Sequence, residues 1–115
     1  MELNLCSCDH AVDHARHIMP GQEAIDGVAE IFKLCGDATR VGILCALCRH
    51  SLCVCDLASV LNMSSSAISH QLRLLKQNGI IRSQRAGKSV VYSIADSKIE
   101  EIFHLALNYS EEKLK

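Results

Sequence analysis

The feature that most constrains this chain is a change in the spacing of its apolar residues near residue 80. Before that point, apolar side chains recur every three or four residues, which is the spacing of helices with one buried face. After it, Ile80 and Ile81 open an extended stretch, and residues 89–95 are rich in β-branched side chains. Gly87 lies between the two stretches and suits the tip of a hairpin. The chain is therefore expected to be mainly α with one small β-hairpin.

Local signals mark where the expected helices begin and end. We expect helices at residues 22–34, from Asp37 to about Arg49, at residues 53–61 and 65–78, and after Asp96. Gly36 and Gly79 suit helix ends, whereas Asp37, Asp96 and either Ser64 or Ser65 suit helix starts. Aromatic residues make up only 3% of the chain and tryptophan is absent, so small aliphatic side chains must fill the interior. That composition favours packed helices over a large sheet.

The length of 115 residues suits one domain. Pro20 and Gly21 separate an N-terminal arm, residues 1–21, from a domain at residues 22–112. The chain lacks any run of about 18 uncharged apolar residues, and its first residues lack the basic start and apolar core of a secretory signal. Seven cysteines without an export signal argue against a disulfide framework. We expect a cytoplasmic protein that makes no membrane contact.

Charge is segregated along the chain. The net charge is −1, yet residues 57–95 hold no Asp or Glu and carry Arg73, Lys76, Arg82, Arg85 and Lys88. Residues 1–56 hold eight acidic and four basic side chains, and residues 96–115 hold five acidic and three basic ones. A contiguous basic third is typical of a surface that binds nucleic-acid phosphates. A solvated basic face without a partner is the alternative.

Two short expected helices, residues 53–61 and 65–78, flank a tight turn at residues 61–64, and a basic hairpin follows. This order is that of a winged helix-turn-helix. The N-terminal end of the second helix would then contact base edges in the major groove of DNA. Its polar residues Ser66, Ser69, His70 and Arg73 share one face, opposite the apolar residues Ile68, Leu72 and Leu75. Serines that only cap the helix are the alternative for this segment.

The residues that we assign to DNA binding combine base-reading and phosphate-binding side chains. Arg73 and Lys76 could reach phosphates, and basic residues near Gly87 could meet the backbone or the minor groove. The full set is Arg40, Ser65, Ser66, Ser69, His70, Gln71, Arg73, Lys76, Arg85 and Lys88. The partner is double-stranded operator DNA. The sequence shows no nucleophile–base pair and no phosphate loop, so we expect neither an enzyme nor a small organic substrate.

Two closely spaced cysteine pairs suggest a metal site. Residues two apart lie about 200° around a regular helix, so Cys53 and Cys55 can converge only at a helix start, where the first residue is not helical. Thiolates suit Cd(II), Pb(II), Zn(II), Cu(I) or trivalent arsenic, antimony and bismuth. One pair supplies two ligands and a closed site needs three or four. The arm pair, Cys6 and Cys8, is the expected source of the rest.

The remaining cysteines and the histidines of the arm have other interpretations. Cys35 and Cys45 fit an apolar pattern and are expected to be small buried hydrophobes. Cys48 is expected to be buried too, although its spacing from Cys45 leaves a ligand pair as an alternative. His10, His14 and His17 would share one face of a helical arm and could form an auxiliary Zn(II) site. A solvated and partly disordered arm is the alternative to that site.

Several motifs in order resemble the ArsR/SmtB family of metalloregulatory repressors. They are residues 37–40 (DATR), 52–58 (LCVCDLA), 66–75 (SAISHQLRLL), 78–81 (NGII) and 87–93 (GKSVVYS). The resemblance covers about residues 22–112, and the cadmium- and lead-sensing CadC-like branch is the most similar. It implies a homodimeric winged helix-turn-helix repressor that releases its operator when metal binds, which would derepress genes of metal efflux or sequestration.

The resemblance also implies a ligand set. Cys53 and Cys55 of one protomer would join Cys6 and Cys8 of the other around Cd(II), Pb(II) or Zn(II) as the inducer. Many relatives bind Zn(II) through their C-terminal helices as well. This chain keeps Asp96 and Glu112 of that pattern but has Lys98 and Tyr109 in place of histidines, and a lysine ammonium has no lone pair for a metal. The C-terminal helix is therefore expected to be a dimer interface only.

Three alternatives remain from the sequence. The first is a repressor that responds to arsenite, antimonite or bismuth, although Ala58 stands where arsenite sensors add a third cysteine. The second is a redox or persulfide sensor in which Cys53 or Cys55 is oxidised. The third is a metal chaperone or buffer, which would not retard duplex DNA.

Overall fold

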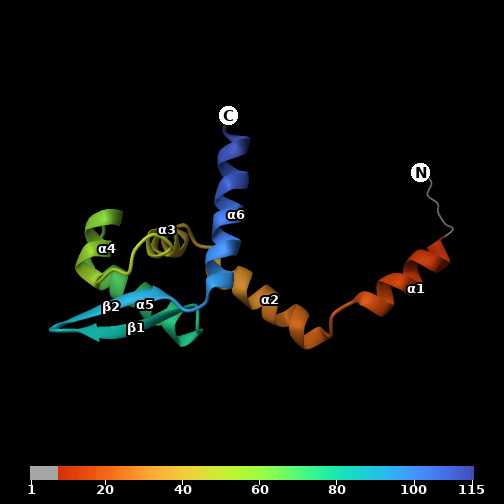
Figure 1. The fold of residues 1–115 in the computed structure, drawn as a ribbon, viewed down its shortest axis with the longest axis horizontal. Helices are drawn as coiled ribbons and strands as arrows, with labels where there is room; N and C mark the ends of the chain where they lie inside the picture. The colour runs from red at the N-terminus through yellow and green to blue at the C-terminus, as the bar shows by residue number, and fades with distance from the viewer. Residues whose placement is uncertain (1–7) are drawn as a thin grey trace. The chain divides into compact units, whose positions relative to one another are not determined.

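The chain divides into two units, Met1–Lys33 and Leu34–Lys115, in a computed structural model that describes residues 8–115. The first unit contains α1 (Cys8–Ile18) and most of α2 (Gln22–Cys35) (Figure 1). Residues 9–20 are exposed, as expected of a solvated arm, but residues 8–18 are helical rather than disordered. The division falls at residue 33 rather than 21, and a domain that begins at residue 22 stays a prediction.

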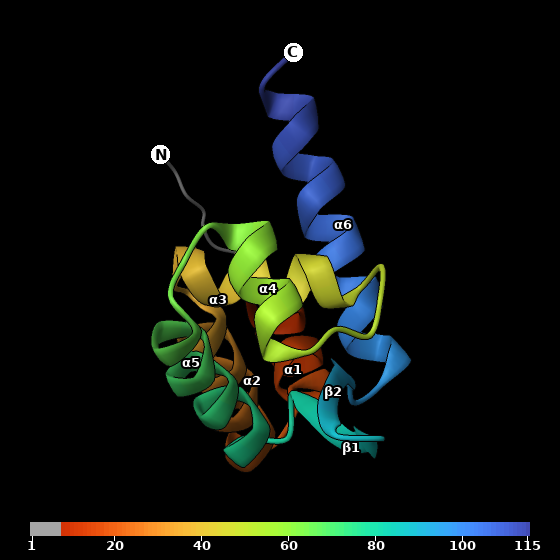
Figure 2. The ribbon, with the colours of Figure 1, turned by 90° about the vertical axis from the view of Figure 1, so that its left-hand side faces the viewer.

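The second unit is a winged helix-turn-helix, and it confirms the expected fold class. Its elements are α3 (Ala38–Leu47), α4 (Val54–Leu61), α5 (Ser65–Gln77), β1 (Ile81–Ala86), β2 (Ser89–Ile94) and α6 (Ser97–Lys113). The two strands form one antiparallel sheet. In Figures 1 and 2 the hairpin follows α5 directly, and α6 leaves the end of β2. The expected helix ends were slightly wrong, since α3 stops at Leu47 and α4 starts at Val54.

Side-chain caps explain where three of these helices begin. Asp37 Oδ2 accepts a hydrogen bond from the Arg40 backbone N–H at 3.1 Å, and Ser64 Oγ accepts one from the Ala67 N–H at 3.1 Å. Asp96 Oδ1 accepts one from the Lys98 N–H at 2.8 Å. Each cap gives a partner to a backbone donor that the first turn of a helix leaves unpaired. The expected caps at Asp37 and Asp96 are confirmed, and Ser64 is the serine that caps α5.

Two tight turns need a left-handed backbone. Asn62 ends α4 with φ 54° and ψ 50°, and asparagine tolerates this conformation better than most residues. Gly87 has φ 65°, in the two-residue turn that joins the paired residues Ala86 and Ser89. A positive φ at the first central residue of such a turn matches the twist of the strands, and glycine adopts it without strain. These turns fix the angle between α4 and α5 and the position of the hairpin tip.

One apolar core joins α3, α4, α5 and the hairpin. Its buried members are Ile43, Leu44, Leu47, Leu57, Ile68, Leu72, Leu75, Ile80, Ile81 and Ile94. The hairpin is also tied to the segment before α4, because Leu52 and Tyr92 exchange backbone hydrogen bonds of 3.1 and 2.8 Å. Helix α5 and the hairpin are therefore both anchored to α3 and α4, which holds them in one arrangement.

Helix α6 is anchored at only one end. Ile99 and Phe103 pack against the core, whereas Ile102, Leu105 and Tyr109 are 44%, 69% and 65% exposed. Figures 1 and 2 show the C-terminal half of α6 extending away from α3, α4 and α5. Among residues 8–115, no helix is both long and apolar enough to cross a membrane.

The cap at Ser64 gives a stability prediction. Ser64→Ala removes the acceptor for the Ala67 N–H and should lower the free energy of unfolding by about 1 kcal/mol in urea denaturation. Ser66→Ala is the control, because Ser66 is exposed in the same first turn and should change stability by less than about 0.5 kcal/mol. Equal losses in the two variants would contradict the assignment of the cap.

Candidate nucleic-acid interface and thiolate site

The polar face of α5, the candidate reading helix, is the surface that we expect to contact bases. Ile68, Leu72 and Leu75 are buried against the core, which turns the opposite side of the helix outward. On that side Ser65, Ser66 and His70 are exposed and Ser69 is half-buried. Short donors and acceptors at the N-terminal end of a helix suit the base edges of a major groove. The structure therefore leaves these four predicted residues accessible.

Basic side chains extend this surface along α5 and onto the hairpin. Arg73 and Lys76 of α5 are exposed, as are Arg85 and Lys88 at the hairpin tip. Arg82 is exposed too, and its Nε donates to Ser93 Oγ at 3.3 Å, so its side chain lies along β2. Because residues 57–95 contain no carboxylate side chain, no acidic side chain of this segment offsets these charges. The arrangement suits attraction to a phosphate backbone.

Two residues of the predicted DNA-binding set are engaged within the chain instead. Arg40 Nη1 donates to Gln71 Oε1 at 3.0 Å, and Arg40 Nε donates to the Leu34 carbonyl at 2.6 Å. Both side chains are half-buried. Sequence reasoning missed this pairing because the partners lie 31 residues apart and neither carries a local signal of the other. A direct contact of either residue with DNA stays a prediction.

The Cys53–Cys55 pair lies at the start of α4, directly before the reading helix. Cys53 has an extended backbone, with φ −89° and ψ 174°, and its N–H donates to Asp56 Oδ2 at 3.3 Å. Cys55 is inside the first turn. The wide angular separation of a regular helix therefore does not apply to this pair, as the sequence predicted. Both thiols are free, Cys53 half-buried and Cys55 exposed, which suits capture of a soft ion from solution.

The remaining predicted ligands belong to the N-terminal arm. Cys6 and the side chain of Cys8 lie outside the part of the chain that the structure describes. His10, His14 and His17 are exposed on α1. Within residues 8–115, no three His, Cys, Asp or Glu side chains stand close enough together to hold a metal ion. The four-thiolate site and the auxiliary histidine site therefore both stay predictions.

Three further thiols, Cys35, Cys45 and Cys48, lie outside the predicted metal site. Cys48 lines a hollow of about 560 Å³ with Glu100 and His104 of α6. Burial raises the pKa of the Cys48 thiol, and the nearby Cys45 and Glu100 raise it further. Burial also raises the pKa of Cys45 and of Cys35. All three thiols are half-buried rather than fully buried as expected, and Cys35 and Cys48 pack against the core.

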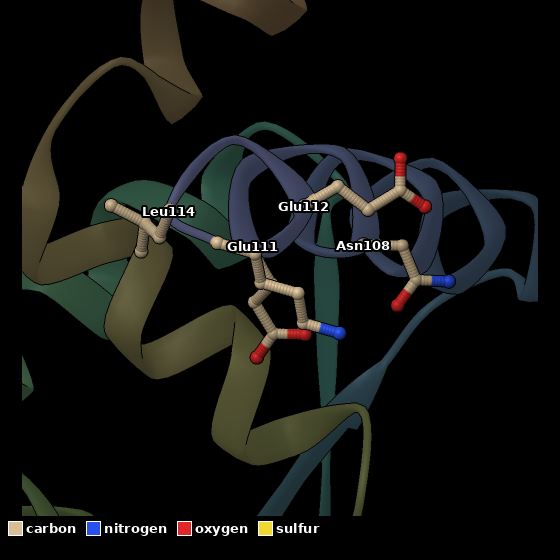
Figure 3. A pocket seen from close by; sticks show the side chains of 5 residues that line it. Asn108, Glu111, Glu112 and Leu114 are labelled. Atoms are coloured by element: carbon tan, nitrogen blue, oxygen red, sulfur yellow. The ribbon is translucent and has the colours of Figure 1, made fainter.

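A further hollow, of about 420 Å³, lies at the C-terminal end of α6 (Figure 3). It is lined by Asn108, Glu111, Glu112, Leu114 and Lys115, so this one helical segment forms the whole lining. In Figure 3 the carboxylates of Glu111 and Glu112 point in different directions. Lys98 and Tyr109, which replace the histidines of the related C-terminal site, are both exposed. The absence of a metal site from this helix stays a prediction.

Comparisons with known proteins identify the relatives of this chain. Residues 37–83 match the model of the arsR family of bacterial regulatory proteins. The chain is 37% identical to a CadC homologue of Staphylococcus aureus, a cadmium resistance transcriptional regulatory protein, over 88% of this chain and 84% of the relative. No enzyme is among these matched proteins.

Two solved structures have similar folds. One is the antimony-specific transcriptional repressor AntR, with a TM-score of 0.73 and 35% identity over 84% of this chain and 86% of that one. The other is the homodimeric winged helix-turn-helix DNA-binding domain Mb0332 of Mycobacterium bovis. Its TM-score is 0.73, with 26% identity over 84% of this chain and 92% of that one.

The burial of the thiols predicts their order of reaction. Iodoacetamide at pH 8 should alkylate exposed Cys55 about tenfold faster than Cys45 or Cys48, because a raised pKa leaves less thiolate and burial limits access. The slower reaction of Cys45 and Cys48 should persist through pH 9, the ordinary thiol pKa, because the pKa of each of these two thiols is raised above it. Peptide mapping by mass spectrometry measures the rates, and urea should abolish the difference. Equal rates in the folded protein would contradict the burial.

Proposed function

Because the chain belongs to the ArsR family of bacterial regulatory proteins, we propose that it is a metal-responsive transcriptional repressor. It binds operator DNA as a homodimer and dissociates when cysteine thiolates bind Cd(II), Pb(II) or Zn(II). The genes that it then releases from repression serve metal efflux or resistance. The observation that carries this proposal is the free Cys53–Cys55 pair at the start of α4, next in the chain to the reading helix.

The DNA part of the proposal rests on the exposed face of α5 and on the hairpin. The N-terminal residues Ser65, Ser66, Ser69 and His70 contact base edges. Arg73, Lys76, Arg85 and Lys88 contact phosphates and fix the register of the protein on the duplex. A protein that acts on operator DNA works in the cytoplasm, as the sequence predicts.

The dimer part rests on α6. Ile102, Leu105 and Tyr109 would be costly to leave in water, and their exposure in one copy suits a helix that packs against a second copy. The similarity to a homodimeric winged helix-turn-helix domain supports this arrangement. A two-fold dimer would present two reading helices to the two half-sites of an operator.

The metal part rests on the chemistry of the donors. Cys53 and Cys55 supply two thiolates, which is too few for a closed site. Cys6 and Cys8, the arm pair of the other protomer, complete it. A soft ion bound there would draw together segments that are far apart in sequence. Thiols must lose their protons to bind it, so metal affinity should rise with pH.

Release of DNA follows from linkage. If the dimer binds metal more tightly in one geometry and DNA more tightly in another, each ligand weakens the other by the same factor. Cys53 immediately precedes α4 and Cys55 lies in its first turn, and α4 and α5 share one core that includes Leu57 and Ile68. A shift of α4 on metal binding therefore moves the reading helix, because a packed core transmits displacement.

A second candidate inducer is a trivalent metalloid. The 35% identity to an antimony-specific repressor favours it. Trivalent arsenic and antimony bind three thiolates, which Cys53, Cys55 and one arm cysteine could supply even without a cysteine at position 58. Operator release measured separately with Cd(II), Pb(II), Zn(II), arsenite and antimonite, each at equal concentration, distinguishes the two classes of inducer.

Serine substitution tests the thiolate site. Cys53→Ser and Cys55→Ser should each bind operator within about twofold of the wild type, because neither residue lies on the reading face. Each should lose Cd(II)-induced release and most of the ultraviolet thiolate-to-metal absorption. Fluorescence anisotropy of a labelled duplex measures both binding and release. Cys35→Ala, which alters a thiol packed against the core, is the control and should respond to metal like the wild type.

Two results would contradict the assigned site. The first is a Cys53→Ser protein that still leaves DNA when Cd(II) is added. The second is a wild-type protein that leaves DNA on treatment with peroxide or polysulfide but not with any metal, which would favour the redox alternative.

The apolar face of α6 gives a test of the dimer. Leu105→Glu places a charge on a side chain that is 69% exposed in one copy, and it should convert the dimer to a monomer at micromolar concentration. Operator affinity should fall about a hundredfold or more, because one half-site contact is lost. Val60→Glu is the matched control, since Val60 is 62% exposed on α4. Sedimentation velocity measures the mass, and a dimeric Leu105→Glu protein would refute the interface.

A further inference from the structure

We infer that Arg40 is a positioning residue, which ties the C-terminal end of α2 to the reading helix α5 through Gln71 and so sets the rotation of α5 for base recognition. The inference rests on the proposed DNA-binding function. It changes the role expected of two residues from direct DNA contact to alignment of the residues that make the contact.

The backbone of Arg40 is fixed by a hydrogen bond of its own, separate from the contacts of its side chain. Its N–H donates to Asp37 Oδ2 at 3.1 Å, which is the cap of α3. Arg40 therefore starts from a defined point in the first turn of α3. A side chain that leaves a fixed backbone loses less freedom when it makes further hydrogen bonds.

The first contact of the side chain is with the end of α2. Arg40 Nε donates to the carbonyl of Leu34, the next-to-last residue of α2, at 2.6 Å. The last carbonyls of a helix have no partner within the helix, and they carry its negative partial charge. A guanidinium is therefore an effective donor at this position, because its N–H gives the carbonyl a hydrogen-bond partner and its positive charge is attracted to the negative end of the helix.

The second contact is with the reading helix. Arg40 Nη1 donates to Gln71 Oε1 at 3.0 Å, across 31 residues of sequence. Gln71 is half-buried, beside Leu72 in sequence and on the edge of the buried face rather than at the centre of the exposed one. The bond to Arg40 uses one of the two lone pairs of Gln71 Oε1 and fixes the direction of the amide group. Bidentate recognition of adenine requires the oxygen and the NH₂ group to face the base together, so the bond to Arg40 competes with that contact.

The position of the contact on α5 explains its effect. Ile68, Leu72 and Leu75 hold α5 against the core by apolar packing, which decides the face that points outward but tolerates small rotations about the helix axis. A hydrogen bond at the edge of that face is directional and resists rotation of the helix. The side chains of Ser66, Ser69 and His70 must meet base edges within hydrogen-bond distance. A small rotation therefore weakens recognition of the operator more than attraction to phosphates.

Arginine is required because one planar group must reach two acceptors. A lysine at position 40 keeps the positive charge but has a single nitrogen, which cannot repeat the divergent Nε and Nη1 contacts. Arg40→Lys therefore separates positioning from a direct phosphate contact, in which the charge alone would suffice.

The test compares two duplexes. One is selected from a random library by the wild-type protein, and the other has the same composition in scrambled order. Anisotropy gives the affinity for each at several salt concentrations, at a temperature where thermal melting shows every variant to be folded. Failure of the wild type to select any duplex would refute the proposed function itself. Results on variants bear on Arg40 only after that selection succeeds.

Arg40→Lys, Arg40→Gln and Gln71→Leu should each lose about tenfold in affinity for the selected duplex, the effect of one charge-assisted hydrogen bond. Affinity for the scrambled duplex and the salt dependence should not change. The double variant Arg40→Gln with Gln71→Leu should lose no more than either single variant, because the two residues act through one contact. Gln71→Glu keeps an acceptor for Arg40 and should retain the preference for the selected duplex.

Two variants serve as matched controls, Arg49→Lys for an exposed arginine after α3 and Gln77→Leu for an exposed glutamine of α5. Both should keep the preference. A direct phosphate contact would instead leave Arg40→Lys unaffected, while Arg40→Gln would weaken both duplexes and lower the salt slope by about one. A merely structural role would lower the melting temperature and leave the preference unchanged in every folded variant. Either result would overturn the inference.

Discussion

The burial of one face of α5 is the interaction on which the rest of the molecule depends. Ile68, Leu72 and Leu75 belong, with Leu44 and Leu57, to a single core that α3, α4, α5 and the hairpin share. Because that face is buried, the polar face of α5 must point outward, and its serines and basic residues become a surface. The same core carries Ile80, Ile81 and Ile94, so the hairpin is held by the packing that holds the helix. One cluster of aliphatic side chains thus positions both parts of the DNA-binding surface.

Polar contacts add direction to this packing. Apolar burial supplies most of the free energy but tolerates small rotations and shifts, whereas hydrogen bonds at the edges of the core do not. The bond from Arg40 to Gln71 and the backbone pair of Leu52 and Tyr92 are both of this kind. The first connects α5 to α3, and the second connects β2 to the segment before α4. A protein that must recognise base edges and also change its geometry when an effector binds can use such contacts, because one hydrogen bond can break while the apolar core stays packed.

The thiols illustrate how local structure divides residues of one type into different roles. Cys53 and Cys55 lie where α4 begins, with the first of them extended and the second exposed. Cys35 and Cys48 are partly buried and pack against the core, where burial raises their pKa values. A thiol that is kept protonated and covered behaves as a small hydrophobe, whereas one at an open helix start is accessible to a metal ion. The exposure of these thiols differs as their spacing in the sequence suggests, and ligation by Cys53 and Cys55 stays a prediction.

The sequence by itself determined the elements, their order and most of their ends. The signals that mark them act over a few residues and can be recognised without the rest of the chain. They are the spacing of apolar residues, the helix caps at Asp37 and Asp96, and Gly87 at the hairpin turn. It also pointed to the exposed face of α5 and to the Cys53–Cys55 pair. Only the tertiary structure decided that Gln71 pairs with Arg40, that Leu52 pairs with Tyr92, and that Glu100 and His104 lie beside Cys48. Such partners are brought together by packing across many residues, and neither member of a pair carries a local mark of the other.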